Sequence, residues 1–91
     1  MAPRPPSLRA VAAFEAAARH QSFTRAAEEL HLTHGAISHA VRALEQRLDV
    51  ELFERVGRRV VLTAAGRIFA DRVRASLAVL SDALELEPIQ Q

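Results

Sequence analysis

Apolar side chains recur every three or four residues through the first fifty positions, the spacing that places them along one side of an α-helix. Three such stretches each follow a hydroxyl residue, Ser7, Ser22 or Thr33, whose side chain can accept a backbone N–H at a helix start. The pattern predicts a helix from about Leu8 to His20 and two more after the other hydroxyls. The apolar stripes are, in chain order, Leu8, Val11, Phe14 and Ala18; Phe23, Ala26, Ala27 and Leu30; and Ile37, Val41, Leu44 and Leu48. Three prolines are expected to keep the first residues extended: Pro3, Pro5 and Pro6.

The pattern changes after the third helix. Two short β-prone runs, Leu52–Phe53 and Val60–Leu62, flank a charged turn, which predicts a small hairpin, or wing, over about 52–62. Thr63 can then cap a last helix from about Ala64 to Glu85. The elements predict a mainly α fold, in which a three-helix core with a small β-hairpin wing is followed by a long helix.

The last helix carries its own apolar stripe, consisting of Phe69, Val73, Leu77, Leu80 and Leu84. A helix of twenty-odd residues is about 30 Å long, and an apolar stripe of that length is seldom left exposed. Two surfaces can cover it, a twin helix of a second copy or the chain's own three-helix core. We favour pairing with a second copy because the helix is long.

Composition narrows the class of protein. The 91 residues are 49% apolar and 25% charged, which is ordinary for one small globular domain. The chain lacks cysteine, so disulfides and thiolate metal sites are excluded, and no apolar run is long enough for a membrane span or a signal segment. We expect a soluble, cytoplasmic protein with no membrane association.

The charged residues indicate nucleic-acid binding only weakly. The net charge is only +1, yet all 12 basic residues are arginine, and their excess over acidic residues lies before Thr63. Arginine matches the geometry of phosphates and guanine edges. A GC-rich genome would give the same preference for arginine, and we favour that explanation.

The second and third helices are joined by a tight turn. The side of the third helix opposite its apolar stripe carries small, polar or basic residues: Gly35, Ser38, His39, Arg42 and Gln46. Two short helices of which the second offers such a face are typical of a helix-turn-helix, whose second helix enters the DNA major groove. The start of the third helix, beside Thr33, can hold a DNA phosphate.

The residues themselves resemble a known family. The stretch Ser22–Leu30 followed by Thr33–Glu45 is similar to the N-terminal domain of LysR-type transcriptional regulators. Leu52–Arg55, with Arg58 and Arg59 after it, then Leu62–Gly66, is similar to that family's wing and its entry into the linker helix. The resemblance covers about residues 6–85, and the stretch Thr33–Ser38 is most similar to glycine-cleavage-activator-like members.

The resemblance implies a winged helix-turn-helix domain over 6–63, with the helix-turn-helix at about 23–42, and a linker or dimerisation helix over 64–87. It implies a homodimer paired through the linker helix that binds double-stranded DNA at an interrupted inverted repeat, needs no cofactor and can form a tetramer in a full-length protein. In full-length members an effector-binding domain follows, and we expect that domain to be absent here. We expect an excised DNA-binding domain rather than a naturally short form.

The family's DNA contacts carry over to individual positions. Base-reading positions match His34, Gly35, Ser38 and His39, and Arg42 is expected to reach a phosphate. The expected set is completed by helix starts and wing residues: Ser22, Thr24, Arg25, Thr33, Arg55, Arg58, Arg59 and Thr63. Family members commonly have Arg or Gln where His39 stands and a bulkier residue where Gly35 stands, so the base preference does not carry over. The expected dimer interface is the stripe of the last helix.

Other functions fit less well. The four histidines are not paired at helical spacing with an acidic partner, so no metal site is expected. Ser38 and His39 are adjacent and point about 100° apart, and no acid or oxyanion hole accompanies them, so no enzyme is expected. Two alternatives stay open: a helical protein-interaction module that uses the last helix, and a fragment that pairs with a full-length regulator and blocks it.

Overall fold

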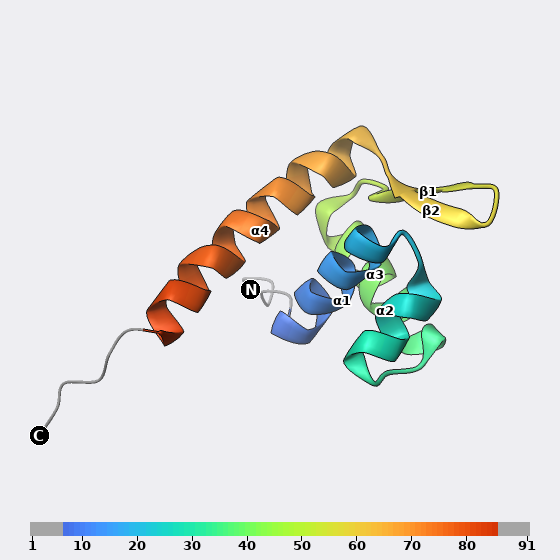
Figure 1. Ribbon diagram of the computed structural model, residues 1–91. Coiled ribbons are helices and arrows are strands. Elements are labelled where there is room, and N and C mark those ends of the chain that lie inside the picture. The colour runs from blue at the N-terminus through green and yellow to red at the C-terminus, as the bar shows by residue number, and fades with distance from the viewer. Residues whose placement is uncertain (1–6, 86–91) are drawn as a thin grey trace, which may run out of the picture.

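The computed structural model describes residues 7–85, which form four helices and one two-stranded sheet. Three helices pack together, a hairpin projects beside them, and the fourth helix leads away along one side (Figure 1). The elements are, in chain order, α1 (Leu8–His20), α2 (Phe23–Leu30), α3 (His34–Leu48), β1 (Phe53–Val56), β2 (Arg59–Leu62) and α4 (Ala64–Leu84). The predicted mainly α fold with a hairpin wing is confirmed. The expected extended prolines and residues 86–87 of the expected linker helix lie outside the described residues.

Each helix starts at the hydroxyl residue that the sequence indicates. The four side chains accept the backbone N–H three residues further on, at 2.9–3.1 Å: Ser7 from Ala10, Ser22 from Arg25, Thr33 from Ala36 and Thr63 from Gly66. Each cap contributes about 1 kcal/mol to helix stability because it satisfies a backbone donor that the helix leaves unpaired. These local bonds explain why the predicted helix starts agree with the structure.

Phe14 of α1 is the centre of the hydrophobic core. Its ring, fully buried, lies 5.5 Å from the ring of Phe53 in β1 and 4.9 Å from that of Phe69 in α4. Ile37 and Leu44 of α3 are buried in the same core. The helices can approach closely because α1 buries small side chains there: Ala10, Ala13, Ala16 and Ala17.

The hairpin pairs Phe53 with Leu62 and Val56 with Arg59 in antiparallel register. Gly57 occupies the first turn position with a φ of +62°, which glycine adopts without the steric cost that a Cβ brings. The hairpin is also held from outside, since the Val60 N–H donates to the carbonyl oxygen of Gln21 at 3.3 Å. The α1–α2 turn therefore fixes the position of β2.

The apolar stripe of α4 is divided between two surroundings. Phe69 and Val73 pack in the chain's own core, and Leu77 is half-buried against it. Leu80 and Leu84 are exposed, since α4 diverges from α1 beyond this point (Figure 1). Phe69 and Val73 are thus used within the chain, and a dimer interface over all five stripe residues stays a prediction. Among the described residues, no helix is both long and apolar enough to cross a membrane.

Candidate nucleic-acid interface

The polar face of α3 is exposed as the sequence predicts. Ile37, Val41 and Leu44 hold the opposite side of the helix in the core. The solvent side carries the expected base-reading residues, of which Ser38 is half-buried and the others are exposed: His34, Gly35, Ser38, His39 and Arg42. Because the buried side anchors α3 along its length, this face is presented on a rigid element.

The starts of α2 and α3 lie next to one another. The ring of Phe23 at the start of α2 is 5.8 Å from the ring of His34 at the start of α3. Thr24 and Arg25, in the first turn of α2, are exposed. The capping oxygens of Ser22 and Thr33 each accept one backbone N–H, and each hydroxyl retains its own proton as a donor. The structure thus brings five of the expected contact residues to one end of the helix-turn-helix: Ser22, Thr24, Arg25, Thr33 and His34.

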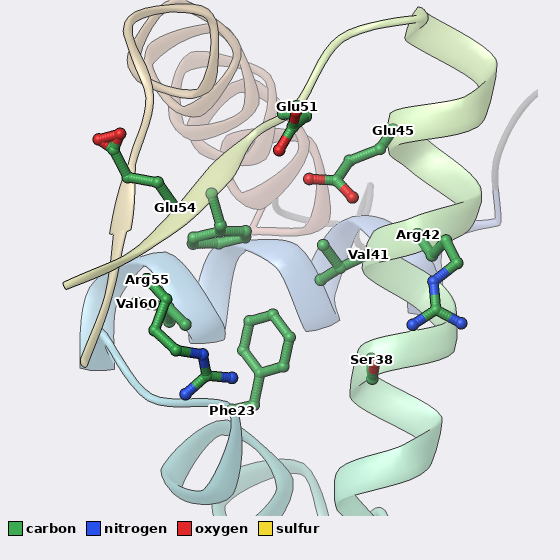
Figure 2. Close-up of a pocket in the computed structure, with 10 residues that line it drawn as sticks. Phe23, Ser38, Val41, Arg42, Glu45, Glu51, Glu54, Arg55 and Val60 are labelled. Carbon is green, nitrogen blue, oxygen red and sulfur yellow. The ribbon is translucent and has the colours of Figure 1, made fainter. Parts of the chain in front are cut away.

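A cavity of about 280 Å³ separates α3 from the hairpin and is lined by Ser38, Arg42 and Arg55 among others. Figure 2 shows the guanidinium groups of Arg42 and Arg55 on two sides of the Phe23 ring, so that α3 and β1 each supply one cation to the same region. The planar guanidinium group is suited to binding phosphate. The cavity joins the polar face of α3 to the wing.

Carboxylates occupy the other part of the same cavity. Glu45, Glu51 and Glu54 line it, and in Figure 2 they lie away from the two guanidinium groups. The carboxylate of Glu45 accepts the backbone N–H of Leu52 at 2.8 Å, so this group holds the start of the hairpin. The positive charge of the cavity is therefore confined to the arginine end, and the carboxylate end would repel an anion.

The wing arginines differ in how they are held. Arg55, Arg58 and Arg59 are all exposed, but the guanidinium of Arg59 donates to Gln21 Oε1 at 3.3 Å. Gln21 thus contacts β2 through both its backbone and its side chain. Gln21 could not be predicted from the sequence, because its contact joins residues 38 positions apart and no spacing rule marks it.

Two expected contact residues also have neighbours outside the cavity between α3 and the hairpin. The Thr63 hydroxyl donates to the carbonyl oxygen of Glu51 at 2.6 Å and accepts the Gly66 N–H at 2.9 Å, and its own N–H donates to Leu52. Thr63 therefore joins the hairpin to α4, and its expected contact with DNA stays a prediction. His39 faces a second cavity, of about 510 Å³, whose lining includes Arg9 of α1. It therefore lies on the side of α3 away from the hairpin.

An ion-pair network joins α1 to α2. The Arg19 guanidinium donates to both oxygens of Glu15 and of Glu29 at 2.8–2.9 Å, and His20 Nε2 lies 2.6 Å from Glu29 Oε1. Hydrogen bonding from Arg19, then from His20, lowers the pKa of Glu29 to about 2. The hydrogen bond from Arg19 also lowers the pKa of Glu15, and the two carboxylates raise the pKa of Arg19. One guanidinium thus pairs with two ionised carboxylates and ties α1 to α2.

The described residues supply no metal-binding cluster. Within residues 7–85, no three side chains of histidine, cysteine, aspartate or glutamate are grouped so that they could hold a metal ion.

Comparison with known proteins gives the family. Residues 8–67 match the model of the bacterial regulatory helix-turn-helix proteins of the lysR family. The chain is 52% identical over 82 residues to the RuBisCO operon transcriptional regulator of Allochromatium vinosum. The match covers 87% of this chain and 27% of that protein. It is 43% identical over 83 residues to the glycine cleavage system transcriptional activator of Escherichia coli K12. That match covers 91% of this chain and 27% of the activator. The chain thus spans about a quarter of the length of these relatives.

A solved structure agrees with this result. The fold is similar to that of the CbnR_DBD-DNA complex with a TM-score of 0.79 and 34% sequence identity, over 85% of this chain and 88% of that chain. CbnR is described as a LysR family transcriptional regulator. The family consists of regulatory proteins rather than enzymes, and the resemblance that the sequence motifs indicate is confirmed. The match over 8–67, together with these relatives, shows that this chain belongs to the lysR family of bacterial regulatory helix-turn-helix proteins.

Proposed function

We propose that this chain binds double-stranded DNA in a sequence-specific manner and acts as the DNA-binding part of a transcription regulator at the bacterial chromosome, in the cytoplasm. The observation that carries the proposal is the pair of guanidinium groups, Arg42 on α3 and Arg55 on β1, beside the exposed polar face of α3. A helix of this width fits the major groove, and its side chains read base edges there. The CbnR_DBD-DNA complex, similar in fold, supports this use of the domain.

The contacts divide into two kinds. His34, Ser38 and His39 are placed to read base edges, and Gly35 allows the backbone of α3 to approach the DNA closely. The helix starts and the arginines are placed to bind phosphates, which fix the register of the protein on the duplex. The wing arginines are placed to contact the flanking minor groove or its phosphates.

We propose that a second copy covers the exposed part of α4. Val79, Leu80 and Leu84 are exposed on the part of α4 that diverges from the core. A groove of about 260 Å³ between α1 and α4, lined by Leu8 and Leu77 among others, continues this apolar surface. Surfaces of this kind on small domains are usually covered by a partner. Two-fold pairing would require an inverted repeat in the DNA, because each copy presents the same helix to its half-site.

Selection of bound duplexes from a random DNA library at physiological salt tests DNA recognition. The wild-type chain should enrich an inverted repeat, and the double variant Ser38→Ala, Arg42→Ala should enrich none. Arg74→Ala is the matched control, since it removes an exposed arginine from the polar side of α4 and should leave the enriched sequence unchanged. No enrichment by a folded wild-type chain would contradict the proposal and favour a protein-interaction module.

Sedimentation without DNA tests the dimer separately. Leu80→Glu places a charge in the apolar surface and should shift the protein to the mass of a monomer. Ser81→Glu adds the same charge at the neighbouring exposed position and should leave a dimer. A wild-type chain that sediments as a monomer at high concentration would contradict pairing through α4.

A further inference from the structure

Both peptide groups of Leu52 are held by other elements. Its N–H donates to the Glu45 carboxylate of α3 at 2.8 Å, and its carbonyl oxygen accepts the N–H of Thr63, the cap of α4, at 3.0 Å. The Leu52 side chain is fully buried. Leu52, in the loop before β1, therefore connects α3 to the start of α4.

The connection to α4 is close as well as directional. Gly66, in the first turn of α4, packs so tightly on Leu52 that a Cβ built on it would lie 2.1 Å from the Leu52 carbonyl oxygen. The Thr63 hydroxyl adds a second bond to this segment, to the carbonyl oxygen of Glu51 at 2.6 Å. The start of α4 consequently has little freedom to rotate on the loop.

The helix α4 packs mainly on α1 and β2 rather than on α3. Apolar packing on α1 attracts without a fixed direction, whereas hydrogen bonds set distance and angle. Among the contacts described, the chain of bonds from Glu45 through Leu52 to Thr63 is a directional link between α3 and α4. Both helices also pack on α1, and this chain of bonds adds a direct connection between them.

We propose that Glu45 is a positioning residue whose hydrogen bond to Leu52 sets the angle between α3 and α4 and thereby the half-site spacing that a dimer accepts. This rests on the proposed pairing through α4. The 21 residues of α4 form a lever of about 30 Å, so a tilt of about 10° at its start moves the far end by about 5 Å. One base pair rises about 3.4 Å, so a loose junction changes the preferred spacing by one or two base pairs.

Binding to a series of inverted repeats whose spacer differs by one base pair at a time tests the proposal. The readout is the ratio of the Kd for an altered spacer to the Kd for the best spacer, which does not depend on the affinity of one half-site. Glu45→Ala should lower this ratio by about threefold to tenfold, the range that one hydrogen bond represents. Glu45→Gln should restore it, because the amide oxygen accepts the same N–H.

Two further variants separate position from charge and from folding. Glu51→Ala removes a carboxylate from the same cavity but leaves the Leu52 bond in place, so it should keep the wild-type ratio. Glu45→Asp keeps the charge but is one methylene too short to reach Leu52, so it should behave as Glu45→Ala does and serves if the alanine variant fails to fold. An unchanged ratio in folded Glu45→Ala or Glu45→Asp would overturn the proposal.

Distances between spin labels test the junction without DNA. The chain has no cysteine, so cysteines introduced at Gln46 of α3 and Ala75 of α4 can be labelled uniquely, with unlabelled chain in excess to keep one labelled copy per dimer. The distance distribution should broaden or shift in Glu45→Ala and return in Glu45→Gln. An unchanged distribution in Glu45→Ala would overturn the positioning role, whether or not the protein binds DNA. If the distribution broadens in Glu45→Ala but the wild-type chain binds no inverted repeat, only the proposed function is contradicted.

Discussion

Replacing Gly66 with alanine tests how α4 is seated on the hairpin. The added Cβ would lie 2.1 Å from the Leu52 carbonyl oxygen and 3.0 Å from both the Leu52 carbonyl carbon and Leu62 Cδ2. The Leu62 side chain can rotate away, but the Leu52 peptide cannot, because hydrogen bonds hold it at both ends. The start of α4 must therefore move outward by about 1 Å to restore an ordinary contact distance.

The magnitude follows from three contributions. Overpacking costs about 1–3 kcal/mol, and contact with rigid backbone places this case at the upper end. The outward movement weakens the hydrogen bond from Thr63 to Leu52, which costs about 1 kcal/mol more. The better helix propensity of alanine offsets up to about 1 kcal/mol. We expect a net loss of about 3 kcal/mol in the free energy of unfolding, which lowers the Tm by roughly 10–25 °C in a domain of this size.

The other two glycines supply matched controls. Gly35, in the first turn of α3, has Thr33 Oγ1 at 3.9 Å as its nearest neighbour, so Gly35→Ala should keep or raise the stability by up to about 1 kcal/mol. Gly57 has open space but a φ of +62°, so Gly57→Ala should cost about 1 kcal/mol from backbone strain alone. Urea unfolding followed by circular dichroism, at one fixed protomer concentration, measures all three. A Gly66→Ala variant that is as stable as wild type, or more stable than Gly57→Ala, would refute the packing argument.

Three further outcomes follow from the core, the wing and the ion-pair network. Phe14→Ala should lower the free energy of unfolding by about 3–5 kcal/mol because it leaves a cavity in the centre of the core, and a loss under 1 kcal/mol in urea unfolding would contradict that placement. Arg55→Ala should reduce the slope of log K against log salt by about 1 if it neutralises one phosphate, whereas Arg74→Ala should leave the slope unchanged. Because Glu29 has a pKa near 2 when folded and about 4.5 when unfolded, its contribution is fully present above pH 4.5 and is lost as the pH falls toward 2. Thermal unfolding of Glu29→Gln should consequently depend less on pH across that window than unfolding of the wild-type chain, and equal pH dependence would argue against the contact with Arg19.

The sequence alone determined the parts of the molecule that depend on neighbours along the chain. The caps Ser22 and Thr33 bond to N–H groups three residues away, and the apolar stripe of α3 follows from helical geometry. The exposed face that carries Ser38 and Arg42 follows from the same geometry, since it lies opposite the stripe. These features could be predicted because each involves residues no more than a few positions apart.

Only the tertiary structure decided how these parts are joined. The apolar pattern of α4 in the sequence could not indicate that Phe69 lies in the core while Leu84 is exposed. Which of these residues is buried depends on the angle at which α4 leaves the hairpin. That angle depends on Gly66 resting on Leu52, and the place of the wing depends on Gln21 bonding to β2. Such contacts join residues 14 to 39 positions apart, and a hydrogen bond or a steric contact over that separation forms only when the whole chain has folded, so helical periodicity and capping patterns cannot indicate it.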